Sequence, residues 1–144
     1  AINNSFPLLV PDMETILVMQ RHRLHEIPDM NTGFGWIEIR GSRYEHDVVI
    51  HADGSVSKRK KKVSKAFRDQ YGHTPLSYGE LSFLEKENPE VVYIGTGQYG
   101  DLPVMPEAAV FISSFHSVIM PTPEILAAVE GEKRRFVAIL HVTC

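Results

Sequence analysis

Apolar residues recur along the chain with two different periods, and the change near residue 33 divides it. Between Asp12 and Pro28 they recur every three or four residues, as on one face of a helix. Asp12 can cap this helix and Pro28 can end it. Residues 16–19 form a continuous apolar run that also suits a strand, so that alternative stays open. We therefore predict an amino-terminal extension, residues 1–32, that contains a helix.

After Gly33, short β-favouring runs separated by turn residues predict an antiparallel meander over residues 34–60. Gly41-Ser42 predicts a tight turn, and Asp53-Gly54 predicts a second hairpin. The expected strands cover residues 34–40, residues 44–51 and a segment beginning near Val56.

Two short helical patterns follow. The apolar positions within residues 63–71 predict a helix that Gly72 can end, because glycine readily adopts positive φ. Ser77 and Glu80 fit a capping box, in which each side chain bonds the backbone N–H of the other residue. Asn88-Pro89 then ends the second helix.

The second half of the chain alternates between strand and helix patterns. Strands are expected at residues 91–94, 118–120 and 136–142, with helices at residues 106–115 and from Thr122. Thr122 can cap the last helix and Gly131 can end it. Two consecutive strand-helix-strand crossovers predict a parallel three-stranded core with right-handed connections. The predicted fold class is therefore α/β, a mixed sheet with helices packed on it.

Length and composition indicate one globular core. A chain of 144 residues buries roughly two thirds of its unfolded surface on folding. No apolar run approaches the ~20 residues needed to span a bilayer. Residues 1–4 lack the pattern of a secretory signal, and Cys144 is the only cysteine, so no disulfide can form within the chain. We expect a soluble, cytoplasmic protein without membrane partners.

Positive charge is concentrated in one segment, although the net charge is −3. The segment contains Lys58, Arg59, Lys60, Lys61, Lys62, Lys65 and Arg68, and the remainder has 8 basic residues against 18 acidic ones. Contacts from Lys58 to Lys62 could bind a polyanion. No aromatic residues interleave with the lysines to stack on bases, so a nucleic acid is not the favoured partner.

The apolar run of residues 91–94 ends in a glycine-rich loop with the spacing of a dinucleotide-binding motif. Pro103 and Pro106 delay the helix that this motif requires, and residues 111–122 contain no acidic residue to hold a ribose. We therefore expect no cofactor. The glycines can serve only to let the backbone turn sharply and pack closely, or the free N–H groups of Gly95 to Gly97 can form a nest for an anion or a partner carboxylate. The candidate ligand- or partner-binding residues are Gly95, Thr96, Gly97, Gln98, Tyr99 and Gly100.

The side-chain pattern indicates neither a metal centre nor a catalytic centre. Along one strand His46 and His51 point to opposite faces, and His46 also points away from Asp47, so these groups cannot all converge on a metal ion. His141 and Cys144 likewise lie on opposite faces of the last predicted strand. We assign no metal ligand and no catalytic residue, and the balance favours a protein that is not an enzyme.

The glycine loop and the strand before it resemble the signature of a known family. Further segments agree with it in order and spacing, among them Phe34-Gly35, Asp53-Gly54, Pro121-Thr122-Pro123 and residues 137–144. Residues 33–144 are thereby identified as a member of the Mth938-like family, the domain-of-unknown-function 498 family, which includes a mitochondrial complex I assembly factor and an adipogenesis-associated protein. The resemblance implies one domain, residues 33–144, with a three-layer fold, an added hairpin and no established catalytic residues.

The leading functional hypothesis is a non-enzymatic binding or assembly module. A cleft at the Gly95–Gly100 loop would hold a small anion or an unknown protein partner, and Gly97→Glu is expected to keep the fold while abolishing capture. The apolar face of the amino-terminal helix could pack on its own domain or on a second copy, so a homo-oligomer is a further expectation.

Two alternatives stay open. One is an enzyme acting on a small anionic substrate, in which Thr96, Gln98 or Tyr99 orients the substrate and His73 or His141 moves a proton. The other is a polyanion-binding protein that uses residues 58–68.

Overall fold

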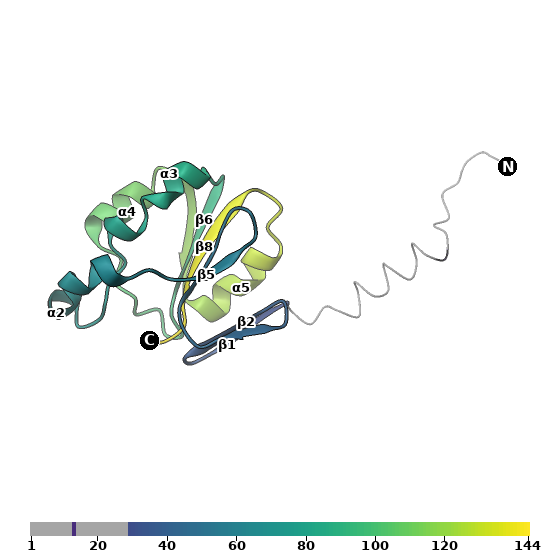
Figure 1. Cartoon of the computed structure of the whole chain (residues 1–144), viewed down its shortest axis with the longest axis horizontal. Coiled ribbons are helices and arrows are strands. Elements are labelled where there is room, and N and C mark those ends of the chain that lie inside the picture. The colour runs from purple at the N-terminus through teal and green to yellow at the C-terminus, as the bar shows by residue number, and fades with distance from the viewer. Residues whose placement is uncertain (1–12, 14–28) are drawn as a thin grey trace.

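The computed structural model describes residue 13 and residues 29–144. The helix predicted between residues 12 and 28 lies, apart from Met13, outside the described residues. A five-stranded sheet forms the centre, with helices on both of its faces, and a three-stranded sheet covers one side (Figure 1). This arrangement confirms the predicted α/β class, with a mixed sheet between helices and an added antiparallel unit. None of the helices in the described part of the chain is long and apolar enough to cross a membrane.

The central sheet is built around the apolar run that ends in the glycine loop. Its strand order is β5-β4-β8-β6-β7, and β6 (Val91–Thr96) is buried along its whole length. The parallel neighbours of β6 are β7 (His116–Met120) and β8 (Phe136–His141). The crossovers run through α4 (Pro106–Ile112) and α5 (Thr122–Glu130), so the predicted parallel core is confirmed. On the side of β8 away from β6, the sheet continues with two antiparallel strands, β4 (Val48–Ile50) and β5 (Val56–Lys58). The predicted turn at Asp53-Gly54 joins them.

Alternate side chains of the central strands build two cores. Val91 and Tyr93 of β6 pack toward α5 and the small sheet. Val92 and Ile94 point the other way, toward α4 and α3 (Phe83–Glu87). A strand with apolar side chains on both faces needs cover on both, which is why the run lacks polar alternation.

The predicted meander over residues 34–60 is wrong, because its strands belong to two sheets. β1 (Met30–Gly33), β2 (Trp36–Ile39) and β3 (Ser42–Tyr44) form the small sheet, and β4 joins the central one. The chain leaves the small sheet at residues 45–47, where the Asp47 side chain is buried and bonded to β8 and to the segment after β5.

Two details of the small sheet also differ from the sequence prediction. Its second turn, between β2 and β3, is Arg40-Gly41 instead of the predicted Gly41-Ser42; both residues have positive φ and lie between the paired residues Ile39 and Ser42. The boundary predicted after residue 32 cuts through β1, where Met30 is buried and its N–H donates to Glu130 Oε1 at 2.6 Å.

The helical segments between the sheets are short. They are η1 (Lys62–Phe67), α2 (Arg68–Tyr71), which Gly72 ends in the left-handed conformation as predicted, and η2 (Tyr78–Glu80). The predicted capping box at Ser77 is wrong, because its hydroxyl bonds Ser64 and the Glu80 carboxylate bonds Arg59. The predicted cap at Thr122 is wrong for a similar reason: its Oγ1 donates to the His141 carbonyl at 2.6 Å and accepts the Gly97 N–H at 2.9 Å.

The glycine loop after β6 closes on the segment that follows β8. Gln98 N donates to the Thr143 carbonyl at 2.7 Å, and the N–H groups of Tyr99 and Asp101 donate to the Cys144 carbonyl at 3.2 and 3.0 Å. At Gly97, which has φ +100°, a Cβ would lie 2.5 Å from the Cys144 carbonyl carbon and 2.7 Å from the Thr143 oxygen. The loop can hold residues 143 and 144 only if position 97 has no side chain.

We therefore predict that Gly97→Ala destabilises the fold, and we withdraw the expectation that Gly97→Glu leaves it intact. Gly54→Ala is the matched control, since Gly54 also has positive φ but has open space where a Cβ would lie. The control should lose about 1 kcal/mol of unfolding free energy, from backbone strain alone. Gly97→Ala should lose roughly 1–3 kcal/mol more, because backbone atoms must move. Urea unfolding of both variants measures the difference, and equal losses would contradict the prediction.

Candidate functional site

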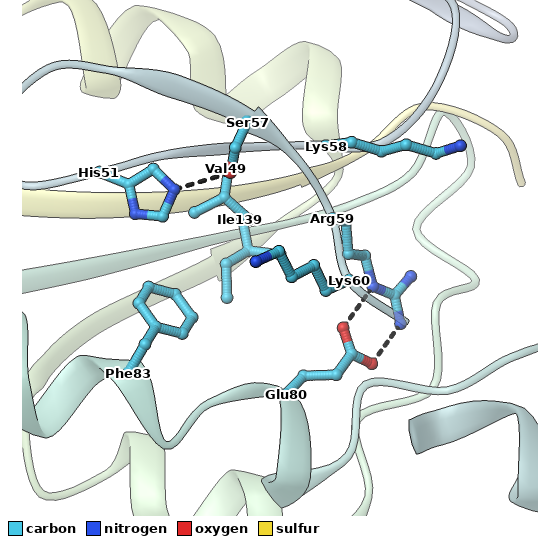
Figure 2. Close-up of a pocket in the computed structure, with 9 residues that line it drawn as sticks. All are labelled: Val49, His51, Ser57, Lys58, Arg59, Lys60, Glu80, Phe83 and Ile139. Atoms are coloured by element: carbon cyan, nitrogen blue, oxygen red, sulfur yellow. Dashed lines mark hydrogen bonds and ion pairs between the residues drawn. The ribbon is translucent and has the colours of Figure 1, made fainter. Parts of the chain in front are cut away.

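The basic run of residues 58–62 does not present one continuous surface. Arg59 is buried, with 3% of its surface exposed, and it lies between two pockets that it helps to line. Lys58 and Lys60 line the pocket shown in Figure 2. Lys61 lines the other pocket, together with Lys65 and Arg68. The fold therefore divides four of the five predicted polyanion-binding residues between two pockets, and the exposed Lys62 lines neither of them.

Arg59 is bound internally by two carboxylates. Its Nε and Nη2 donate to the two oxygens of Glu80 at 2.7 and 2.8 Å, the fork-to-fork pair visible in Figure 2. Its Nη1 donates to Asp47 Oδ2 at 3.0 Å, and Nη2 also donates to the Pro75 carbonyl at 2.8 Å. Burial alone would lower the pKa of the guanidinium, but the neighbouring carboxylates raise it. Arg59 thus anchors the structure and has little capacity left for an external phosphate.

Asp47 links this arginine to the end of β8. Its Oδ2 accepts from His141 Nδ1 at 2.7 Å and its Oδ1 accepts the Val142 N–H at 2.9 Å. Burial alone would raise the pKa of Asp47, but the hydrogen bonds and the charges of His141 and Arg59 outweigh it and lower this pKa to about 2. An ionised carboxylate can only accept, so Nδ1 of His141 carries a proton. In the neutral imidazole, Nε2 is then free of hydrogen and faces Thr143 Oγ1 at 3.1 Å.

A basic pocket of about 350 Å³ opens over this histidine. One wall comes from η1, α2 and the loop after α2, and the other comes from the end of β8 and the residues behind it. Its lining residues are Arg59, Lys61, Lys65, Arg68, Gly72, His73, Thr74, His141, Thr143 and Cys144. Among these described residues none is acidic, so the pocket gathers positive charge and hydroxyl donors around one space.

His73, His141 and Cys144 meet in this pocket. Cys144 Sγ lies 3.2 Å from His73 Nδ1 and 3.6 Å from His141 Nε2. The prediction that His141 and Cys144 point apart is wrong, because β8 ends at His141 and the following residues leave strand geometry to bind the glycine loop. Within the part of the chain that the structure describes, no set of three His, Cys, Asp or Glu side chains has the geometry of a metal site.

The pocket in Figure 2 has a different chemistry. It encloses about 250 Å³, with an apolar floor of Val49, Phe83 and Ile139. At its edge His51 Nε2 lies 2.7 Å from Ser57 Oγ, and His51 Nδ1 lies 2.7 Å from Glu87 Oε2. The other oxygen of Glu87 accepts the Ala52 N–H at 2.9 Å, so this hydroxyl-imidazole-carboxylate chain fastens the β4-β5 turn to α3. Sequence reasoning missed it, since Glu87 lies 36 residues from His51.

The predicted glycine-loop residues contact residues 143 and 144 through the backbone and do not line the basic pocket. The premise that the N–H groups of Gly95 to Gly97 are free is wrong at Gly97, whose N–H donates to Thr122 Oγ1. The next two N–H groups donate to the carbonyls of residues 143 and 144. Gln98 Nε2 donates to Thr32 Oγ1 at 3.0 Å, and Tyr99 is exposed beside Phe34. Groups of the chain itself therefore accept the N–H groups of residues 97, 98, 99 and 101.

The comparisons with known proteins give structural relatives only. No family model matches the sequence, and no curated protein matches it. A conserved hypothetical protein from Pyrococcus horikoshii is 33% identical with a TM-score of 0.70, over 79% of this chain and 97% of that one. A protein described as MT938 is 35% identical with a TM-score of 0.66, over 79% and 96%. A Bordetella pertussis protein described as a Mth938-like domain is 18% identical with a TM-score of 0.45, over 95% and 92%.

We predict that Asp47→Asn loses about 3 kcal/mol of unfolding free energy near neutral pH, since it removes the charge that balances a buried guanidinium. The pKa of Asp47 in the folded protein, about 2, lies below its ordinary 3.8. Its contribution to stability is therefore complete above pH 3.8 and disappears as the pH falls toward 2.

Urea unfolding at several pH values between 2 and 7 measures both effects. The acid-dependent loss across that interval should be smaller in Asp47→Asn than in the unmodified protein. Asp101→Asn makes the same change at an exposed position outside any helix; it is the control and should change neither the stability nor its slope with pH. An Asp47→Asn variant with unmodified stability at pH 7 would refute the role of this carboxylate.

Proposed function

The chain belongs to the Mth938-like family, and from that starting point we propose that it is a binding module that holds a small anion in its basic pocket. The observation that supports this proposal best is the convergence of Lys61, Lys65, Arg68 and His73 on one space whose lining contains no acidic residue among the described ones. The glycine loop has a supporting part, because it holds residues 143 and 144 in place as one wall.

The cations of this pocket have no carboxylate partner among its described lining residues. The two nearest buried carboxylates, Asp47 and Glu80, are both engaged with Arg59. Their oxygens are thus occupied by internal hydrogen bonds, and the three groups together keep a net charge of −1 inside the fold. Lys65 and Arg68 are exposed at the rim and contribute long-range attraction, which a small space with several donors can focus.

The size of the pocket favours a small ligand. A volume of about 350 Å³ lies near the lower end of the range for small-molecule sites. Thr74 and Thr143 add hydroxyl groups to the cationic side chains, a combination that suits phosphate or carboxylate oxygens. A long polyanion would instead need a continuous track of cations, and Arg59 interrupts it by being buried.

The proposal predicts that inorganic phosphate binds and that Lys65→Gln/Arg68→Gln weakens binding about tenfold, a change of ~1.4 kcal/mol. Lys86→Gln/Lys133→Gln removes the same two charges from exposed positions outside the pocket and should bind phosphate as the unmodified protein does. Titration followed by amide NMR shifts measures the affinity, and the shifts should centre on residues 61–74 and 141–144.

A second titration with a single-stranded oligonucleotide separates the two anion classes. Tight, steeply salt-dependent binding of the oligonucleotide that exceeds phosphate binding would replace this proposal by the polyanion alternative. Equal phosphate affinity in the two double variants, or no phosphate binding at all, would overturn the proposal.

A further inference from the structure

We propose that Cys144 is a reactive thiol that exchanges with the disulfides of small anionic thiols in the basic pocket. This inference rests on the proposed function, because the same cations would draw the charged disulfide toward the sulfur. It goes further in assigning a covalent reaction to one atom, Cys144 Sγ.

Two imidazole nitrogens from different parts of the chain face the sulfur. His73 Nδ1 lies 3.2 Å away, in the exposed loop after α2, and His141 Nε2 lies 3.6 Å away, at the buried end of β8. Both are within the range of hydrogen bonds that involve sulfur. A thiol needs to lose its proton to act as a nucleophile, and a neighbouring imidazole can accept that proton or stabilise the thiolate that it leaves.

Asp47 orients the deeper of the two histidines. Its Oδ2 accepts a hydrogen bond from the Nδ1–H of His141 at 2.7 Å, which leaves Nε2 as the acceptor on the side of Cys144. When Nε2 gains the thiol proton, the ionised carboxylate stabilises the imidazolium, and Thr143 Oγ1 at 3.1 Å can accept the new hydrogen. The order carboxylate, imidazole, thiol is that of an activated nucleophile.

The backbone fixes the position of the thiol. The carbonyl of Thr143 accepts from Gln98 N at 2.7 Å, and the carbonyl of Cys144 accepts from Tyr99 N and Asp101 N. Cys144 remains partly exposed at the pocket. The glycine loop thus holds a reactive group at the surface, which gives a physical role to the residues singled out in the sequence.

Disulfide exchange suits these surroundings better than acyl transfer. Acyl transfer needs free N–H donors for the developing oxyanion, and the N–H groups of Tyr99 and Asp101 already bind the Cys144 carbonyl. In the exchange, His141 Nε2 takes the thiol proton and Sγ attacks one sulfur of the disulfide. A bond forms between Cys144 and that half, and the other half leaves as a thiolate that takes up a proton. Cys144 is oxidised to a mixed disulfide as the departing thiol is reduced.

The test uses the fact that the chain contains one cysteine, so every reacting thiol is Cys144. Rates are measured with a carboxylated disulfide, dithiobis(nitrobenzoate), and with an uncharged one, dithiodipyridine. An acetylated peptide of residues 136–144 is the reference. Dividing the rate of the protein by the rate of the peptide with the same reagent cancels the intrinsic reactivity of that reagent. The protein should exceed the peptide with both reagents, and by about tenfold more with the carboxylated one.

Variants separate the two causes. Lys65→Gln/Arg68→Gln should slow only the carboxylated reagent, whereas Lys86→Gln/Lys133→Gln should slow neither. His73→Gln, at an exposed position, should slow both reagents severalfold without unfolding the protein. Cys144→Ser should abolish both reactions. A protein that reacts no faster than the peptide with either reagent, or a His73→Gln variant with unchanged rates, would overturn the reactive thiol.

Phosphate titration of Cys144→Ser distinguishes this failure from failure of the proposed function. If the variant binds phosphate but the thiol of the unmodified protein is unreactive, the exchange reaction is refuted and the anion site is supported. An equal enhancement over the peptide with both disulfides would overturn the selectivity for anionic ones, and absence of phosphate binding would then also overturn the proposed binding module.

Discussion

A buried, ionised carboxylate constrains the whole structure: Asp47 must find partners for both of its oxygens inside the fold. Leaving such a charge unpaired in a nonpolar interior would cost several kcal/mol, so the chain around it is arranged to supply donors. They come from Arg59 beyond β5, and from His141 and Val142 at the end of β8. Because these segments are far apart in sequence, satisfying one side chain fixes where three pieces of backbone meet.

The hydrogen bonds of Asp47 position segments on both sides of it along the chain. Toward the amino terminus, Asp47 draws the backbone out of the small sheet and into the central one, which separates β3 from β4. Toward the carboxyl side, it orients His141 and holds Arg59 inward with Glu80. Lys61, Lys65 and Arg68 then line a pocket to which no described carboxylate side chain contributes. Structural pairing of one arginine therefore shapes the electrostatics of the site beside it.

The glycine loop and the pocket form two sides of one arrangement. On one side, N–H groups of residues 98, 99 and 101 bind carbonyls of residues 143 and 144. On the other side, the side chains of those residues face His73 and the cations. The relatives of 33% and 35% identity share the fold over 79% of this chain, but a shared fold does not assign chemistry. The chemistry has to be read from the side chains that this chain places in the pocket.

Local patterns were enough to predict the core and the ends of several elements. The unbroken apolar run of residues 91–94 predicts a strand buried on both faces, and Gly72 and Gly131 end helices where expected. These features depend on neighbours within a few residues, and the spacing of apolar and turn residues records such neighbours directly.

Side-chain partners depended on the tertiary structure. Ser77, Glu80 and Thr122 have the residue types of helix caps, yet their oxygens bind groups brought near by packing. Likewise His73 and Cys144 are 71 residues apart and meet only because the glycine loop turns the end of the chain toward α2. A polar group bonds whichever partner lies within about 3 Å in space, and sequence spacing does not record that distance. The sequence by itself thus determined the layered α/β core, and only the tertiary structure decided which charges and nucleophiles share a site.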